Sequence, residues 1–378
     1  MSPQKIWVVR HPGECRGPVG QTAFKVSCKS WIPAFADRAS RKCRVGAAGM
    51  TGLIKMVFWG IVITAGLLGN GQSSEPDLPL TVATQNYGHT RALRDGAVKV
   101  PGCAIEYVSL PLDALNAHAF GDKKFDVTEV EILPFLAKQA AGEPQDYVLV
   151  PVFLLREFQL RDIWIRTDRG IKSPEDLRGK KVGVDGGGNT GVLWMRGFLQ
   201  SSAAVKPADV TWIDVQKEKK GSLLFLLESG QADAILGVGT PKGPNVQRLF
   251  PDYRAVEQAE FKISRVFPIM TALAVRADLV KQNAWLPEAL FIAFSEAKGK
   301  AVENLGTENE PKIPLPWGPD SFQETLDLMG KNYWSYGVPD NPKSLKALLT
   351  FAFEQGIIQK EMEASEVFDP STLQLTEK

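Results

Sequence analysis

The stretch from Leu177 to Gln200 reads LRGKKVGVDGGGNTGVLWMRGFLQ, and the prediction of the fold begins from it. KKVGV is a short apolar run bounded by charge, which is typical of a buried strand. Asn189 and Thr190 follow three glycines and precede a run with helical apolar spacing. We therefore expect a helix to begin there, capped by one of these two side chains.

A turn of this kind is suited to an anion. The free N–H groups and the positive dipole end of the helix point into it, and Gly186, Gly187 and Gly188 would let a ligand approach the backbone closely. The turn lacks the GK[ST] of a phosphate loop and does not fit the dinucleotide fingerprint. Two interpretations stay open: a binding site that includes Asn189 and Thr190, or an ordinary strand-to-helix turn.

Composition limits the class of protein. The chain has 378 residues, enough for two domains, with 44% hydrophobic and 23% charged residues, as in ordinary globular proteins. Residues 1–49 hold nine Lys and Arg but two Asp and Glu, so the formal net charge of +1 leaves about −6 for the remainder. A mildly acidic body without a basic patch argues against nucleic acid as a partner.

Cysteine and histidine are too few in the body for a disulfide framework or a His-rich metal site. Three of the four cysteines lie before residue 50, which leaves Cys103, and the body has His89 and His118 as its histidines. We therefore expect no metal.

The N-terminal part contains two segments outside the predicted fold. Residues 1–49 mix Pro, Gly, Arg and isolated aromatics without periodicity, and we interpret them as a disordered or non-native extension preceding a true start at Met50 or Met56. Residues 50–77 have the layout of a secretory signal: one lysine, an apolar run of about a dozen residues and a polar exit. The alternative is that this segment is also non-native.

From Leu78 onward, strand patterns alternate with helix patterns, which indicates a mostly parallel α/β architecture. Polar breaks near 167–181 and 240–265 suggest that the chain leaves one lobe and later returns to it. We predict a discontinuous first lobe, 78–170 plus 263–378, a second lobe, 171–262, and a ligand cleft between them.

Four segments carry a resemblance to a known family: RTDRGIKSPEDLRGKKVGV (166–184), RLFPDYRAVE (248–257), RVFPIM (265–270) and SYGVPDNPKSLKALLTFAFEQGI (335–357). Together they resemble the 4,5-dihydroxyphthalate decarboxylase family, which is related to the NMT1/THI5-like proteins and has the type 2 periplasmic-binding-protein fold. The resemblance covers nearly all of residues 79–375. It implies non-oxidative removal of a carboxylate from an electron-rich ring, with no organic cofactor.

Some positions match the family pattern and others depart from it. Tyr87, Thr90 and Arg91 match the tyrosine, threonine and second arginine after the first strand; FDV-E matches at 125–129, and PVF followed by Arg matches at 151–156. The departures remove charged or acid–base groups: the sequence has His89 instead of arginine, Gln159 and Leu160 instead of Arg-His, and Thr271 instead of histidine.

These matches and the strand ends suggest the candidate site residues. His89 is a candidate proton donor or a surface histidine, and Glu129 a cleft acid or, with Glu131 on the same strand face, half of a solvated pair. For substrate binding the candidates are Tyr87, Arg91, Arg156, Gly186, Gly187, Gly188, Asn189 and Thr190. Arg156 either clamps a carboxylate or pairs within the protein; Trp334 either stacks on a substrate ring or packs in the core.

Two functional interpretations remain open. The first is a decarboxylase of an aromatic dicarboxylate, favoured by the resemblance. The second is a periplasmic substrate-binding protein that delivers a small aromatic carboxylate to the permease of an ABC importer, favoured by the signal-like segment and the altered cleft. A true signal at 50–77 predicts a periplasmic protein, and its absence a cytoplasmic one.

Overall fold

The computed structural model describes residues 77–186, 188–219, 221–237, 239–305 and 316–377. The predicted extension at 1–49 and nearly all of the signal-like segment at 50–77 lie outside these ranges. None of the helices that the structure describes combines the length and apolar character needed to cross a membrane.

The first sheet has the strand order β2-β1-β3-β10-β4. Its strands are β1 (Leu78–Thr84), β2 (Cys103–Ser109), β3 (Val127–Glu131), β4 (Tyr147–Val150) and β10 (Thr271–Arg276). β1 pairs in parallel with β2 and β3, whereas β10 runs antiparallel between β3 and β4. The carboxyl ends of β1 and β3 therefore meet the amino end of β10 at one edge of the sheet.

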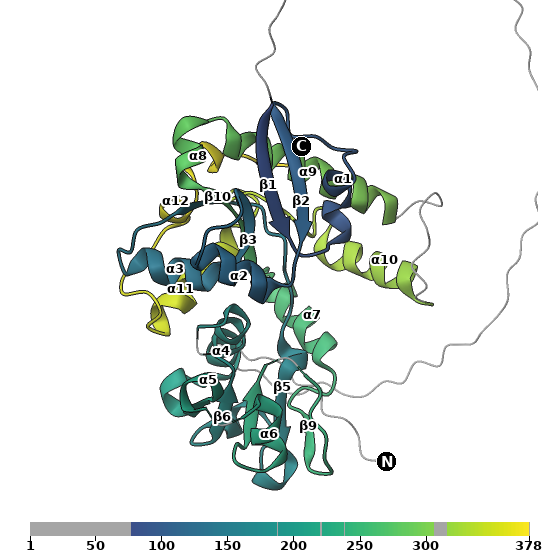
Figure 1. Ribbon diagram of the computed structural model, residues 1–378. Coiled ribbons are helices and arrows are strands. Elements are labelled where there is room, and N and C mark those ends of the chain that lie inside the picture. Colours follow the sequence, from purple (N-terminus) through teal and green to yellow (C-terminus); the bar gives the residue numbers. More distant parts are fainter. Residues whose placement is uncertain (1–76, 187, 220, 238, 306–315, 378) are drawn as a thin grey trace, which may run out of the picture. The chain divides into compact units, whose positions relative to one another are not determined.

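Helices from both ends of the chain surround this sheet (Figure 1). Those before the crossing are η1 (Gly88–Thr90), α1 (Arg91–Arg94), α2 (Leu112–Phe120) and α3 (Ile132–Ala140). Those after it are α8 (Ala277–Gln282), α9 (Leu286–Leu305), α10 (Gly318–Met329), α11 (Pro342–Glu354), α12 (Ala364–Val367) and η6 (Pro370–Thr372). α9 buries Leu290, Phe294 and Lys298 at a spacing of four residues, the period of one helix face.

The second sheet has the order β7-β6-β8-β5-β9. Its strands are β5 (Ile163–Arg166), β6 (Lys181–Val184), β7 (Thr211–Asp214), β8 (Ala234–Leu236) and β9 (Val246–Arg248). Around it lie η2 (Leu160–Asp162), η3 (Thr167–Arg169), η4 (Pro174–Leu177), α4 (Thr190–Ala203), η5 (Pro207–Asp209), α5 (Val215–Glu218), α6 (Leu223–Glu228) and α7 (Tyr253–Ser264). In each sheet four strands thus run in one direction, and one strand, β10 in the first sheet and β5 in the second, runs in the opposite direction.

Alternation along β5 shows why the second sheet is covered on both faces. Ile163 and Ile165 pack in one apolar cluster with Val182 and Leu199, while Trp164 packs in another with Leu226. Successive strand residues point to opposite faces, so a strand that is apolar throughout needs a layer on each side. The expected two-lobed α/β fold is confirmed.

The sheets differ from the expected lobe boundary at one strand. β5 was expected in the first lobe, which was predicted to extend to residue 170, but it pairs with β8 and β9 in the second sheet. The segments that leave and re-enter the first sheet run antiparallel and form a bridge between Arg156 and Ile269. The crossing therefore precedes β5, and the polar stretch at 167–181 is a connection within the second lobe.

Candidate functional site

The predicted strand, turn and helix start at 181–203 are all present. β6 ends at Val184, Gly186 has a φ of +75°, and Asn189 caps α4 by accepting a hydrogen bond from the Val192 N–H at 3.2 Å. A positive φ is a conformation that glycine adopts without steric cost. Gly188 is exposed, with open space where a Cβ would be, and Gly187 lies outside the described residues.

The first turn of α4 already holds a carboxylate, and that carboxylate belongs to the protein. The Thr190 N–H donates to Glu131 Oε1 at 2.8 Å, while Asn116 Nδ2 donates to Glu131 Oε2 at 3.3 Å. The Thr190 hydroxyl accepts a hydrogen bond from the Leu133 N–H at 3.3 Å. In this structure the N-terminus of α4 therefore contacts a carboxylate of the protein itself, that of Glu131 in the first sheet.

Glu129 forms the centre of a polar cluster at the edge of the first sheet. Its side chain is fully buried and accepts hydrogen bonds from the Gln85 N–H (2.9 Å), Tyr87 Oη (2.7 Å) and Thr271 Oγ1 (2.8 Å). None of these partners is charged, and burial raises the pKa of Glu129 above its ordinary value. Glu129 is therefore not half of a solvated pair: it is a buried carboxyl group that accepts hydrogen bonds from three neutral donors.

Tyr87 and His89 form one stack above this cluster. Their rings lie 4.8 Å apart and nearly parallel, and Trp334 lies 5.4 Å from the His89 ring on a tilted plane. Burial, together with the charge of Lys298, lowers the pKa of His89 to about 4. His89 is therefore neutral near pH 7, and neither the surface histidine nor the imidazolium proton donor fits this placement. Its Nε2 is buried without a hydrogen-bond partner among the described residues.

The structure does not bring Arg91 to the cluster. Its side chain is exposed and its Nε lies 3.0 Å from Asp95 Oδ2, one helical turn away on the surface. A sequence match at this position could not separate a surface ion pair from a ligand contact.

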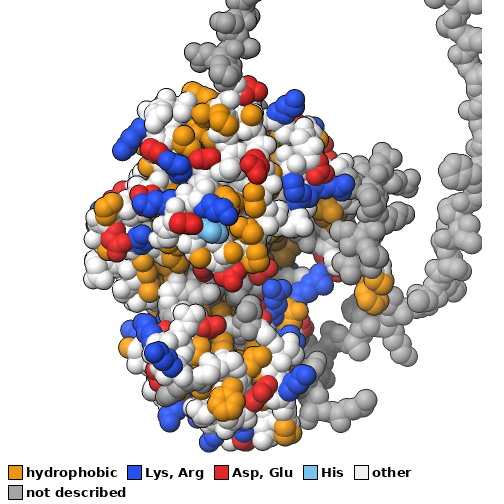
Figure 2. Space-filling model, viewed as in Figure 1, with side chains coloured by type: hydrophobic (Ala, Val, Ile, Leu, Met, Phe, Trp, Pro, Cys, Tyr) orange, Lys and Arg blue, Asp and Glu red, His pale blue; other side chains and the backbone are white. Residues whose placement is uncertain are grey.

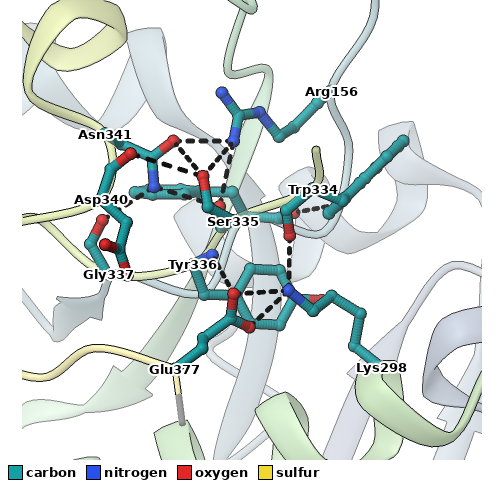
Figure 3. A network of polar contacts seen from close by, with 10 residues as sticks. Arg156, Lys298, Trp334, Ser335, Tyr336, Gly337, Asp340, Asn341 and Glu377 are labelled. Atoms are coloured by element: carbon teal, nitrogen blue, oxygen red, sulfur yellow. Dashed lines mark hydrogen bonds and ion pairs between the residues drawn. The ribbon is translucent and has the colours of Figure 1, made fainter. Parts of the chain in front are cut away.

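Arg156 is turned into the first lobe. Its side chain is buried, and Nη1 donates to the Ser335 carbonyl at 3.0 Å and to Asn341 Oδ1 at 2.7 Å (Figure 3). Nη2 donates to the Phe267 carbonyl at 2.8 Å. Burial lowers the pKa of Arg156 to about 9. Of the two roles considered for it, pairing within the protein is the one that this geometry shows.

Lys298 is a functional candidate that the sequence analysis missed. Its Nζ donates to the Trp334 carbonyl and to Glu377 Oε2, each at 2.6 Å, and lies 4.5 Å from the centre of the Tyr336 ring (Figure 3). Lys298 follows Leu290 and Phe294 at intervals of four residues on α9, so its position in the apolar face of this helix could have indicated from the sequence that the lysine is buried. Its charge is one cause of the lowered pKa of His89.

Gln85 and Thr271 were also missed as members of the site. Both are uncharged residues at the strand edge, and their role depends on the neighbouring Glu129.

Within the described residues, no group of three or more His, Cys, Asp or Glu side chains is arranged to hold a metal ion. On the face shown in Figure 2, basic and acidic side chains are interspersed over the surface.

Most of the chain is similar in sequence to known proteins. The family model described as "NMT1/THI5 like" matches residues 107–304. A protein named 4,5-dihydroxyphthalate decarboxylase from Comamonas testosteroni is 31% identical over 324 residues, which cover 79% of this chain and 98% of the relative. One of the same name from Pseudomonas putida is 32% identical over 202 residues, covering 46% and 78%.

Solved structures with some likeness include a sulfonate-binding protein from Methylobacillus flagellatus, with a TM-score of 0.48 and 16% identity over 79% of this chain and 93% of that one. A Candida albicans protein described as having the generic periplasmic binding protein fold has a TM-score of 0.46 and 13% identity, covering 79% and 98%.

Proposed function

The chain belongs to the NMT1/THI5-like family that includes the 4,5-dihydroxyphthalate decarboxylases, and we propose that it catalyses the non-oxidative decarboxylation of an aromatic dicarboxylate. The observation that carries the proposal is Glu129. It is a fully buried carboxyl group, hydrogen-bonded to neutral donors, whose pKa is raised by burial. Burial favours the protonated form of this carboxyl group, and a protonated carboxyl group can deliver its proton during the reaction.

The proposed reaction breaks the bond between a ring carbon and its carboxylate. The electron pair of that bond stays on the ring, carbon dioxide leaves, and the ring carbon gains one proton. A hydroxyl group para to the departing carboxylate supplies electron density, so the balance needs no oxidant or reductant. Tyr87, whose hydroxyl lies 2.7 Å from Glu129, is the proposed relay of the proton to the ring.

The substrate's second carboxylate is proposed to bind at the first turn of α4. The Thr190 N–H and the helix dipole favour an anion there, and Glu131 already shows that a carboxylate fits. The substrate would take the place of Glu131, with Asn189 at the cap beside it. Neutral His89, stacked on Tyr87, is the proposed acceptor of a hydrogen bond from a ring hydroxyl.

A binding protein for an ABC importer is the second candidate. It is favoured by Thr271, which stands where the family has a histidine and here donates to Glu129 at 2.8 Å without being able to exchange a proton at neutral pH. On this proposal the chain is periplasmic, and residues 50–77 act as its signal. N-terminal sequencing of the native protein tests this part: a chain beginning near 71–78 supports export.

The activity is tested with 4,5-dihydroxyphthalate by measuring released carbon dioxide and the ring product. We expect turnover by the wild type, its loss in Glu129→Gln, and unchanged turnover in the matched control Glu106→Gln, which alters an exposed glutamate of β2. Calorimetric binding without carbon dioxide release would refute the decarboxylase and support the importer. Turnover that survives Glu129→Gln would refute the assignment of the proton source.

A further inference from the structure

A cavity of about 190 Å³ is lined by residues other than those of the proposed site. It is formed by residues 158–160 of the crossing segment, by α4, α7 and α11, and by the segment that returns to β10. None of the predicted site residues lines it.

Aromatic side chains form much of the wall. Phe158 comes from the crossing segment, Trp194 and Phe198 from α4, and Phe351 from α11. Trp194 is held in place because its indole N–H donates to the Ile269 carbonyl at 2.9 Å, and it meets Phe351 edge to face with ring centres 5.8 Å apart. These rings provide faces of negative electrostatic potential, which attract a cation.

Both charged residues that line the cavity are acidic. Glu257 and Glu260 lie three residues apart on α7, and no Lys, Arg or His is among the described lining residues. Glu257 Oε1 accepts from the Leu160 N–H at 2.8 Å, and Glu260 Oε2 accepts from the Ser202 hydroxyl at 3.2 Å. The second oxygen of each carboxylate has no hydrogen bond within the described part of the chain, so it can accept one from a ligand.

The volume limits the size of an occupant. In an unrelated protein, an engineered apolar cavity of about 150 Å³ binds benzene. The present cavity is somewhat larger, enough for one six-membered ring with a short substituent.

From these three features we propose that the cavity is a second ligand site, which binds a small organic ammonium ion carrying one apolar ring. The ring packs against the aromatic walls, and the ammonium group donates to Glu257 and Glu260. A carboxylate of the same size is rejected, because the two glutamates would repel it and the described lining residues include no cation to pair with it.

The charge state of Glu257 should also make ligand binding depend on pH. Burial raises its pKa to about 7. The charged groups around it are Arg161 and Asp162 on η2 and Glu260 on its own helix, while the lining residues of α4 and α11 are uncharged. Binding of an ammonium ion should therefore strengthen between pH 6 and pH 8, as Glu257 loses its proton.

The test titrates benzylammonium into the full chain by calorimetry at pH 8, with benzoate and toluene as matched ligands. We expect one benzylammonium per chain, weaker binding of toluene and no binding of benzoate. Benzoate binding as tightly as benzylammonium, or no benzylammonium binding at millimolar concentration, would overturn the proposal.

Variants locate the binding in this cavity. Glu257→Gln should weaken benzylammonium binding roughly tenfold and remove its pH dependence, whereas Glu175→Gln, at an exposed position, should change neither. Ser201→Phe, which fills the cavity from an exposed position on α4, should abolish binding while the melting temperature shows that the chain remains folded. Unchanged binding in Ser201→Phe would place the ligand elsewhere and contradict the proposal.

Discussion

Replacing Glu131 by Gln should have opposite effects on stability and on ligand affinity. The Glu131 carboxylate accepts the Thr190 N–H at 2.8 Å at the N-terminus of the 14-residue helix α4. Glutamine keeps an oxygen acceptor but removes the charge. A partly buried anion at a helix N-terminus contributes about 1 kcal/mol, so we expect the free energy of unfolding to fall by about that amount.

Ligand affinity should rise by the same free energy. If the substrate carboxylate takes the place of Glu131, the Glu131 carboxylate must leave the Thr190 N–H before the ligand binds. Weakening this internal contact by about 1 kcal/mol should therefore strengthen ligand binding roughly fivefold. Urea unfolding followed by tryptophan fluorescence measures the first effect, and calorimetry with 4,5-dihydroxyphthalate measures the second. Glu106→Gln is the control and should change neither quantity.

The refuting result is specific. Lower stability accompanied by unchanged or weaker ligand binding would show that Glu131 does not occupy the ligand's position. The turn of α4 would then be an internal contact between the two lobes, and the substrate carboxylate would bind elsewhere.

Three further predictions concern stability. Burial raises the pKa of Glu257 to about 7, so the folded state binds this proton more tightly than the unfolded state does. As the pH rises from about 4.5 to 8, the wild type should therefore lose on the order of 2–3 kcal/mol more stability than the Glu257→Gln variant. Parallel urea titrations of the two proteins measure this difference. Lys298→Met should destabilise the fold by about 3–5 kcal/mol, since it leaves Glu377 buried without its cation, and the double variant with Glu377→Gln should recover part of the loss. Arg156→Ala should lower the free energy of unfolding by about 2–4 kcal/mol, because Asn341 Oδ1 and the carbonyl groups of Ser335 and Phe267 each lose one hydrogen-bond donor. Ligand binding that weakens without any loss of stability would instead show that Arg156 contacts the ligand.

Features of this chain that arise from neighbouring residues are predictable from the sequence, whereas features that depend on distant residues are not. The strand, turn and helix start at 181–203 were predictable because hydrophobic period, glycine conformation and N-capping all act within a few residues. The position of β5 was not: its residues specify a strand, but nothing in Ile163–Arg166 states which of two sheets it joins. That choice is made by pairing with β8 and β9, about 70 to 80 residues later along the chain.

The candidate site divides in the same way. The sequence by itself placed Tyr87, His89 and Glu129 after or within predicted strands, and it predicted the glycine turn and helix start that form the N-terminus of α4. Tertiary structure alone decided the partners: Glu131 meets Thr190 across 59 residues, Arg156 meets Asn341 across 185, and Lys298 meets Glu377 across 79. The physical reason is that backbone conformation depends on neighbouring residues, whereas a buried charge is satisfied by whichever distant group the folded chain brings within hydrogen-bond distance.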